Sequence, residues 1–266
     1  MEMSCACKGI RTCPVCEAAG KQPKLFVKDT EVRTFDYCDR CMKAWERGSS
    51  VHPNHMGPGL AFPGIFIQPN FVSKAEEAAF VDKIDKTAFV ESQSGRRKQD
   101  FGPKVNFKKR KVRSACFSGL PDFSKPIYER MKKLEVLSDF IPVEQCHLEY
   151  TPERGSSIDP HFDDFWLWGE RLVTVNLLSD TILYFICDEH PGIEVHVPMA
   201  RRSLIVVYGE ARTKWKHAIH RSDISDRRLA ITLRELSSEF SDGGARSEEG
   251  QALLDIALTF RGYAVQ

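Results

Sequence analysis

The amino-acid sequence predicts an α+β, mainly β fold in which a β-sheet core carries flanking helices. From residue 145 to residue 236, β-branched and aromatic residues come in short runs, separated by turn residues such as Pro191-Gly192. Many short strands at this spacing favour an antiparallel sandwich or a double-sheet barrel over a parallel sheet. Helical patterns flank this region, at residues 73–86, 124–137 and 248–260.

The chain divides into three predicted parts. Residues 1–50 form a polar, cysteine-rich segment with little periodicity, and residues 51–63 form a linker punctuated by proline and glycine. The main domain spans residues 64–266. In it, Ser73 and Glu76 have the spacing of a capping box at the start of the first helix, and Pro126 lies in the first turn of the second. The predicted strands are residues 65–67, 145–150, 172–178, 182–187, 193–197, 203–208, 215–220 and 229–236.

The composition is that of a globular protein without a strong charge. The 266 residues are 42% hydrophobic and 28% charged, and the net charge is +1. This balance provides no global field that would attract nucleic acid or acidic lipid. No apolar run approaches the roughly 18 residues of a membrane-spanning helix, and the N-terminus lacks the apolar stretch of a secretory signal. We therefore expect a soluble intracellular protein that is neither secreted nor membrane-spanning.

One short segment carries the pattern of a metal site. His161 and Asp163 are two residues apart, so on an extended backbone both side chains point the same way. His217 supplies a second imidazole later in the chain. Two histidines and one carboxylate on one side of an iron are typical of non-haem Fe(II) oxygenases. Asp164 would point to the opposite face, and His220 projects differently from His217, so both are interpreted as structural.

A later strand supports an anionic ligand. Residues 228–234 alternate strictly, which places Arg228 and Arg234 on one face together with Ala230 and Thr232. Two guanidinium groups on a core-like strand are costly unless anions meet them, and 2-oxoglutarate offers two carboxylates. The Thr232 hydroxyl, between the two arginines, would help to line such a site. The alternative interpretation is a surface strand whose arginines are solvated.

These motifs resemble a known family. His161-Phe-Asp163, then His217, then Arg228-x-Ala230-x-Thr232-x-Arg234 are similar to the HxD…H…RxNxTxR signature of the AlkB family of Fe(II)/2-oxoglutarate dioxygenases. The similarity extends over about residues 60–240. Longer blocks closely resemble one member of the family: residues 7–13, 93–100, 102–107, 152–155 and 166–172.

The resemblance implies a double-stranded β-helix (jelly-roll) core and a complete cofactor site. By position, His161, Asp163 and His217 correspond to the catalytic iron ligands, and Arg228 and Arg234 to the residues that hold the two carboxylates of 2-oxoglutarate. The implied cofactors are Fe(II), 2-oxoglutarate and O₂.

Further positions follow or depart from the family pattern. Tyr150 matches the family tyrosine that hydrogen-bonds the cosubstrate, whereas Ala230 stands where the family often has Asn and so removes one polar contact. The basic stretch 96–113 corresponds to the lid that covers the substrate in relatives. A lid of this charge could contact a phosphate backbone or an acidic protein surface, or it could be a solvated hairpin.

The implied reaction is oxidative N-demethylation. The resemblance points to methyl-lysine in protein, with actin as the substrate, and to N6-methyladenine in DNA as a second implied substrate. It also implies a location in the cytoplasm and nucleus. The alternative is a zinc-dependent interaction or scaffold protein that regulates actomyosin or chromatin partners without turnover, although a scaffold has no physical need for an intact metal triad and two arginines.

The N-terminal cysteines predict a second metal. The pairs Cys13-Pro-Val-Cys16 and Cys38-Asp-Arg-Cys41 have a spacing close to that of a zinc ribbon, so these four residues are the predicted ligands of one Zn²⁺. Redox-active or merely buried thiols are the alternative. Cys5 and Cys7 are left over, as ligands or free thiols. The histidines without a partner at ligand spacing are interpreted as structural: His52, His55, His147, His190 and His196.

Overall fold

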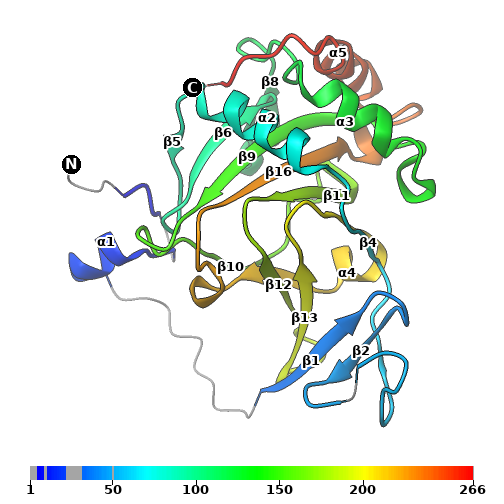
Figure 1. Ribbon diagram of the computed structural model, residues 1–266. Coiled ribbons are helices and arrows are strands. Elements are labelled where there is room, and N and C mark those ends of the chain that lie inside the picture. Colours follow the sequence, from blue (N-terminus) through cyan, green and yellow to red (C-terminus); the bar gives the residue numbers. More distant parts are fainter. Residues whose placement is uncertain (1–4, 9–10, 22–31, 50, 266) are drawn as a thin grey trace.

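The computed structural model describes residues 5–8, 11–21, 32–49 and 51–265. Within these residues, two seven-stranded sheets face each other and a small hairpin stands apart from both (Figure 1). The major sheet has the order β4 (Ile65–Gln68), β14 (Leu204–Val207), β11 (Trp168–Leu177), β16 (Arg228–Leu236), β9 (Pro142–Tyr150), β6 (Arg97–Phe101) and β5 (Val90–Glu91). The expected antiparallel double-sheet arrangement is confirmed.

The minor sheet lies against one face of the major sheet. Its order is β10 (Ile158–His161), β15 (Lys216–Ile219), β12 (Thr181–Ile186), β13 (Ile193–Met199), β1 (Arg33–Cys38), β2 (Lys43–Glu46) and β3 (Leu60–Ala61). The separate hairpin consists of β7 (Lys104–Asn106) and β8 (Lys111–Arg113). One core cluster, which includes Tyr150, Phe185 and Val195, fills the space between the two sheets.

Helices cover the other face of the major sheet (Figure 1). Phe80 of α2 (Lys74–Asp85) and Ile127 of α3 (Ser124–Met131) pack there with apolar residues of β11 and β16. Strand β16 therefore has two buried faces, and its alternation directs Leu229, Ile231 and Leu233 toward the helices. The remaining helices are α1 (Pro14–Ala18), α4 (Gly209–Thr213) and α5 (Ser247–Ala257).

The predicted helices are confirmed with shorter ends. The Ser73 hydroxyl accepts a hydrogen bond from the Glu76 amide at 3.2 Å, and the Glu76 carboxylate accepts one from the Ser73 amide at 2.8 Å, as a capping box requires. The second helix ends at Met131 rather than near residue 137, because Leu134 adopts an extended backbone before a 3₁₀ turn at Glu135–Leu137. That break lets Leu137 pack into the core under the helices.

Part of the cysteine-rich segment belongs to the two-sheet core and is not separate from it. Strand β1 pairs in parallel with β13, from Arg33 opposite Ile193 to Asp36 opposite His196. Phe35 and Tyr37 of β1 are buried in the core between the sheets, and the Tyr37 hydroxyl donates to the carbonyl of Ile65 at 3.3 Å. The predicted linker also contributes β3, which pairs with β2. The predicted boundary near residue 64 therefore does not separate two structural units.

The prediction of one zinc site made of Cys13, Cys16, Cys38 and Cys41 is wrong. Strand β1 carries Cys38 to the far edge of the minor sheet, whereas Cys13 precedes α1 on another side of the molecule (Figure 1). The two Cys-x-x-Cys pairs belong to two different groups of neighbouring side chains. The first is Cys5, Cys7, Cys13 and Cys16, and the second is Cys38, Cys41, His52 and His55.

In the part of the chain that the structure describes, no helix is both long and apolar enough to cross a membrane.

Candidate active site

A cavity of about 590 Å³ lies between the two sheets. Strands β9, β11 and β16 form one wall, and β10, β12 and β15 form the other. The cavity is lined by all of the predicted iron and cosubstrate residues: Tyr150, His161, Asp163, His217, Arg228, Thr232 and Arg234. Residues from widely separated parts of the chain, between Tyr150 and Arg234, therefore meet in one cavity.

The two histidines face each other from neighbouring strands. His161 at the end of β10 is the register partner of His217 in β15, and their ring centroids are 4.3 Å apart. Nδ1 of His161 lies 2.9 Å from the carbonyl oxygen of Asp159, a contact that places the proton on Nδ1 and leaves Nε2 free as a ligand. Burial lowers the pKa of His161, and burial with the neighbouring His161 lowers that of His217 to about 3. Both rings are therefore neutral, as metal ligands must be.

Asp163 lies just after β10, and its carboxylate is bound by an arginine. Nη2 of Arg234 donates to Oδ1 of Asp163 at 3.2 Å. Burial alone would raise the pKa of Asp163, but the Arg234 guanidinium outweighs it and holds that pKa well below its usual range. The group is an anion beside two neutral imidazoles, which is the donor set that suits Fe(II).

The neighbouring Asp164 has a different role. Its Oδ1 accepts hydrogen bonds from the amides of Trp166 at 2.9 Å and Leu167 at 3.1 Å. Arg212 donates to the backbone carbonyls of Asp163 and Asp164 at 3.0 and 3.2 Å. These contacts fix the loop after β10, so Asp164 is a turn-forming residue even though it also borders the cavity.

Arg228 is a buried cation with an unused donor. Its side chain is 1% exposed, its Nε donates to Oδ1 of Asn176 at 2.7 Å, and its guanidinium lies 4.7 Å from the centre of the Tyr150 ring. Nη1 is buried and has no hydrogen-bond partner among the described residues. An unpaired buried guanidinium N–H is costly, and a carboxylate entering the cavity would satisfy it.

The other arginine is already paired. Nη1 of Arg234 donates to Oε2 of Glu144 at 2.6 Å, and its remaining donors face Asp163. Arg228 and Arg234, the two predicted partners of the 2-oxoglutarate carboxylates, therefore differ. A carboxylate of 2-oxoglutarate would find an unpaired donor at Arg228, but at Arg234 it would compete with the carboxylates of Glu144 and Asp163. The Thr232 hydroxyl between the two arginines donates to the Cys146 carbonyl at 3.1 Å and can still accept.

Sequence reasoning missed Asn176 and Glu144. Asn176 of β11 is fully buried and donates to the carbonyls of Ser179 and Met199, which fixes the amide that holds Arg228. It is also the register partner of Ala230, the position where the family pattern often has Asn. The only signal available was a buried-looking Asn inside an apolar run. Glu144 had no signal of its own.

The other residues considered in the sequence have mixed outcomes. Trp168 lines the cavity, whereas Trp166 and Trp215 pack in core clusters. His147 is a core residue, and His220 stacks on Tyr184 with ring centroids 3.7 Å apart, so both are structural as expected. His52 and His55 lie beside Cys38 and Cys41, neighbours that the sequence spacing did not indicate.

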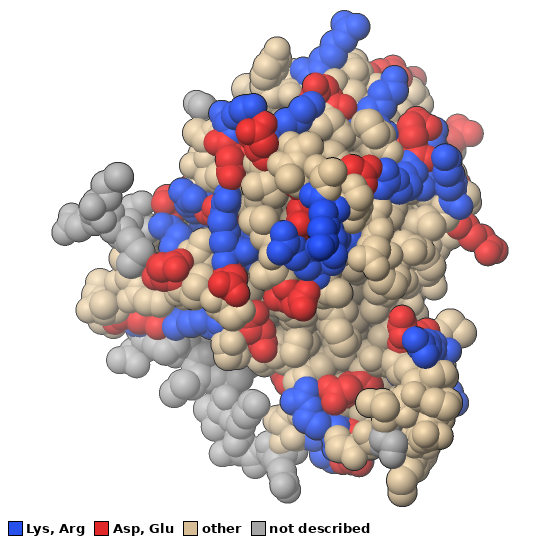
Figure 2. All heavy atoms as spheres, viewed as in Figure 1, with Lys and Arg blue, Asp and Glu red and all other residues tan. Residues whose placement is uncertain are grey.

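The basic stretch forms the rim of the cavity. It contains β6, the β7–β8 hairpin and Phe107, which is 42% exposed, borders the cavity and lies 6.3 Å from Trp168 between ring centroids. On the face shown in Figure 2, Lys and Arg side chains are interspersed with Asp and Glu and do not form a field of one sign.

Relatives with known descriptions share almost the whole chain. No protein-family model matches it. It is 45% identical to the human "Alpha-ketoglutarate-dependent dioxygenase alkB homolog 4" over 292 residues, covering 98% of this chain and 95% of the relative. The chain belongs to the AlkB family of Fe(II)/2-oxoglutarate-dependent dioxygenases. The AlkB relatives also include a Caenorhabditis elegans protein described as "DNA N6-methyl adenine demethylase", 33% identical over 93% of this chain and 92% of its own.

A solved structure of the same kind supports the fold. "The structure of OsALKBH1" aligns with a TM-score of 0.50 at 11% identity, over 65% of this chain and 99% of that one. The core is thus the jelly-roll of AlkB dioxygenases, and this member is an enzyme that depends on Fe(II), 2-oxoglutarate and O₂.

Proposed function

We propose that this dioxygenase removes methyl groups from nitrogen, with Fe(II) held by His161, Asp163 and His217 and with 2-oxoglutarate held along β16. The observation that carries the cosubstrate assignment is the unpartnered Nη1 of Arg228 in the cavity. One carboxylate of 2-oxoglutarate meets Arg228 and the adjacent Tyr150, and Thr232 lines the path toward Arg234. Iron, when bound, supplies the activation of O₂ that oxidises both 2-oxoglutarate and the methyl group.

The protein's own residues prepare this chemistry. The Asp159 carbonyl orients His161, and burial keeps both imidazoles unprotonated. Arg234 keeps Asp163 ionised but also holds its carboxylate, so metal binding requires that carboxylate to share its oxygens between Arg234 and the iron.

Methyl-lysine in protein is the proposed substrate, with actin as the proposed protein. The rings of Phe107, Phe162 and Trp168 border the cavity together with the carboxylate of Asp164. Aromatic faces and a carboxylate suit a methylated ammonium group. On the face shown in Figure 2 the charges of both signs are interspersed, and the net charge of +1 adds no global attraction for a DNA backbone. With these substrates, a location in the cytoplasm and nucleus is also proposed.

N6-methyladenine in DNA is the second proposed substrate. The description of the Caenorhabditis elegans relative supports it, and so do Arg96 and Lys98, which border the cavity on the basic side.

The deciding experiment measures formaldehyde release by the iron-reconstituted protein. Matched peptides with and without methyl-lysine are compared with oligonucleotides with and without N6-methyladenine. Release from the methylated peptide alone supports the leading proposal, and release from the oligonucleotide alone replaces it with the second. Absence of formaldehyde and of succinate under all conditions would favour the scaffold alternative over an enzyme.

A further inference from the structure

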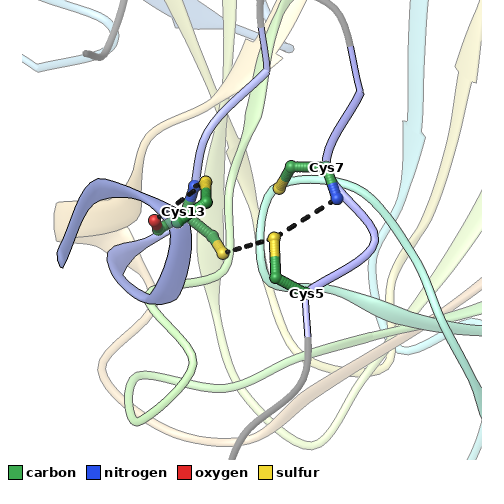
Figure 3. A group of neighbouring side chains, drawn as sticks. Cys5, Cys7 and Cys13 are labelled. Atoms are coloured by element: carbon green, nitrogen blue, oxygen red, sulfur yellow. Dashed lines mark hydrogen bonds between the residues drawn. The ribbon is translucent and has the colours of Figure 1, made fainter. Parts of the chain in front are cut away.

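The N-terminal part of the chain brings two groups of metal-ligating side chains together. In the first, the four sulfur atoms of Cys5, Cys7, Cys13 and Cys16 all lie within 4.8 Å of one another. Sγ of Cys5 is 3.4 Å from Sγ of Cys13, and Figure 3 shows the thiols of Cys5, Cys7 and Cys13 pointing toward one another. Four thiolates around Zn²⁺ at about 2.3 Å would be about 3.8 Å apart, so this group is close to the spacing that tetrahedral zinc needs.

The surroundings of the first group suit a negatively charged metal site. Sγ of Cys7 accepts a hydrogen bond from the amide of Ser94 at 3.1 Å. Arg11 interacts electrostatically with Cys7, and Arg221 interacts with Cys13. A zinc ion with four thiolates has a net charge of −2, which donors and cations of this kind stabilise. Pro14 also packs against Gly155, where a Cβ would lie 2.4 Å from Cγ of Pro14, so the segment is held close to the catalytic core.

The second group combines thiols and imidazoles. Cys38 is the last residue of β1, Cys41 lies in the turn between β1 and β2, and His52 and His55 come from the loop that follows β2. Sγ of Cys41 lies 3.3 Å from Nδ1 of His52. The four ligand atoms lie within 4.8 Å of one another, which is the Cys₂His₂ set of structural zinc sites.

His55 gives an independent indication that this second group has a ligand. Its ring stacks on Trp45, with centroids 4.5 Å apart and planes 3° from parallel, so its orientation is fixed. Both of its ring nitrogens are buried, and neither has a hydrogen-bond partner in the described part of the chain. A buried imidazole without partners is costly, whereas coordination to a metal uses one of those nitrogens.

We propose that the chain binds two zinc ions, one through Cys5, Cys7, Cys13 and Cys16 and one through Cys38, Cys41, His52 and His55. Among the described cysteines none forms a disulfide, so all six of these thiols are available. An iron–sulfur cluster is the competing occupant of the four-cysteine group, but its own iron and sulfide atoms lie between the thiolates and hold them farther apart. Each zinc ties an irregular segment to the core: the first joins residues 5–16 near the loop of Ser94, and the second joins the β1–β2 turn to the loop at residue 55.

The first test counts metals on the intact chain. Native mass spectrometry and elemental analysis of freshly purified protein are expected to find two zinc ions per chain in addition to the catalytic metal. Cobalt is then exchanged for zinc, because thiolate-to-cobalt absorption reports only sulfur-coordinated sites and ignores the histidine–carboxylate triad. A total of one thiolate-bound metal, or none, would overturn the proposal. A visible iron–sulfur absorption would overturn the zinc assignment for the four-cysteine group.

The second test separates the two sites. Cys16→Ser and His55→Ala are each expected to lose one of the two zinc ions, and the double variant is expected to lose both. Cys116→Ser, which replaces an exposed cysteine outside both groups, serves as the matched control and keeps both ions. If Cys16→Ser abolished binding at both sites, the groups would form one centre and the proposal of two would be wrong.

A third variant tests the second site even if Cys16→Ser or His55→Ala fails to fold. His55→Cys retains four ligands and is expected to keep two metals while its cobalt absorption becomes more intense, because the second site then has three thiolates. An unchanged cobalt spectrum would show that His55 is not a ligand.

Discussion

The two faces of β9 and β16 are both buried, but they differ in whether their ionisable side chains have hydrogen-bond partners. On the face toward the helices, His147 has a partner for each ring nitrogen, Gln99 at 2.8 Å and Gln145 at 2.7 Å. On the face toward the cavity, Arg228 keeps a buried donor without a partner among the described residues. The helix face also has one unpartnered atom, Oε1 of Gln145, but it is neutral and costs less than a buried charge. The paired His147 stabilises the fold, whereas the unpaired donor of Arg228 borders the cavity, where a ligand can bind it.

The largest expected effect comes from the metal ligands of the cavity. We expect Asp163→Ala or His161→Ala to reduce 2-oxoglutarate turnover to background, because either change removes a donor that the iron needs. The far-UV circular dichroism and the Tm should stay close to those of the wild type. Asp242→Ala is the matched control, since it removes an exposed carboxylate that does not line the cavity. Near wild-type turnover in either alanine variant would contradict the ligand assignment.

The helix face should respond in stability and not in cosubstrate binding. Ile231→Ala removes a fully buried side chain from the cluster under the helices, so the free energy of unfolding should fall by about 2–5 kcal/mol. Urea denaturation measures this loss. Titration of 2-oxoglutarate into the folded variant should give nearly the wild-type affinity. A large loss of affinity would mean that the two faces are not independent.

The open donor at Arg228 predicts a loss of cosubstrate affinity. Arg228→Lys keeps the charge but loses the planar guanidinium, and a lost charge-assisted hydrogen bond costs about 1.5–3 kcal/mol, which is roughly 10- to 100-fold in affinity. Titration of 2-oxoglutarate into anaerobic Fe(II) protein measures it, and iron affinity should barely change. Equal binding by variant and wild type would remove the basis for the cosubstrate site.

The histidine on the helix face predicts a pH dependence of stability. Burial lowers the pKa of His147 to about 3, below the value of about 6.5 in an unfolded chain. Between these pH values His147 is protonated in the unfolded chain but stays neutral in the folded protein. The free energy of unfolding therefore decreases as the pH falls from 6.5 toward 3. His147→Gln should reduce the slope of the unfolding free energy by at most about 1.4 kcal/mol per pH unit. Denaturant titrations at several pH values test this, and an unchanged slope would contradict it.

The smallest effect is expected at Arg234. Its donors already face Glu144 and Asp163, so 2-oxoglutarate gains less there than at Arg228. Arg234→Lys should therefore weaken 2-oxoglutarate binding less than Arg228→Lys does, by less than about tenfold. A larger loss of 2-oxoglutarate affinity in Arg234→Lys than in Arg228→Lys would contradict the conclusion that Arg228 contributes more to binding the cosubstrate.

A structural feature could be predicted from the sequence where residues close together in the chain determine it. The faces of β16 follow from the two-residue period of any strand, so the grouping of Arg228 with Arg234 was readable from the alternation alone. The capping box at Ser73 was readable for the same reason. The grouping of the cysteines was not, because most of the eight side chains in the two groups lie in loops without periodicity, and only the fold decides which pair meets which.

Strand β1, one of several strands that the sequence did not predict, has a distant partner. The short alternation of Phe35 and Tyr37 is ambiguous until β13 is present to pair with it. Asn176 was missed because its function lies in a contact with Arg228, 52 residues later in the chain.

The parallel pairing of β1 with β13 has a consequence for synthesis on the ribosome. Arg33 is the register partner of Ile193, so β1 leaves the ribosome 160 residues before its partner strand does. At about 5–20 residues per second, that interval is roughly 8–32 s, during which β1 can pair with β2 but Phe35 and Tyr37 still lack β13 and the core that buries them. The four ligands of the second cysteine–histidine group are complete by residue 55. Zinc can therefore fold the β1–β2 turn early in translation and protect this nascent segment from aggregation until the rest of the sheet is made.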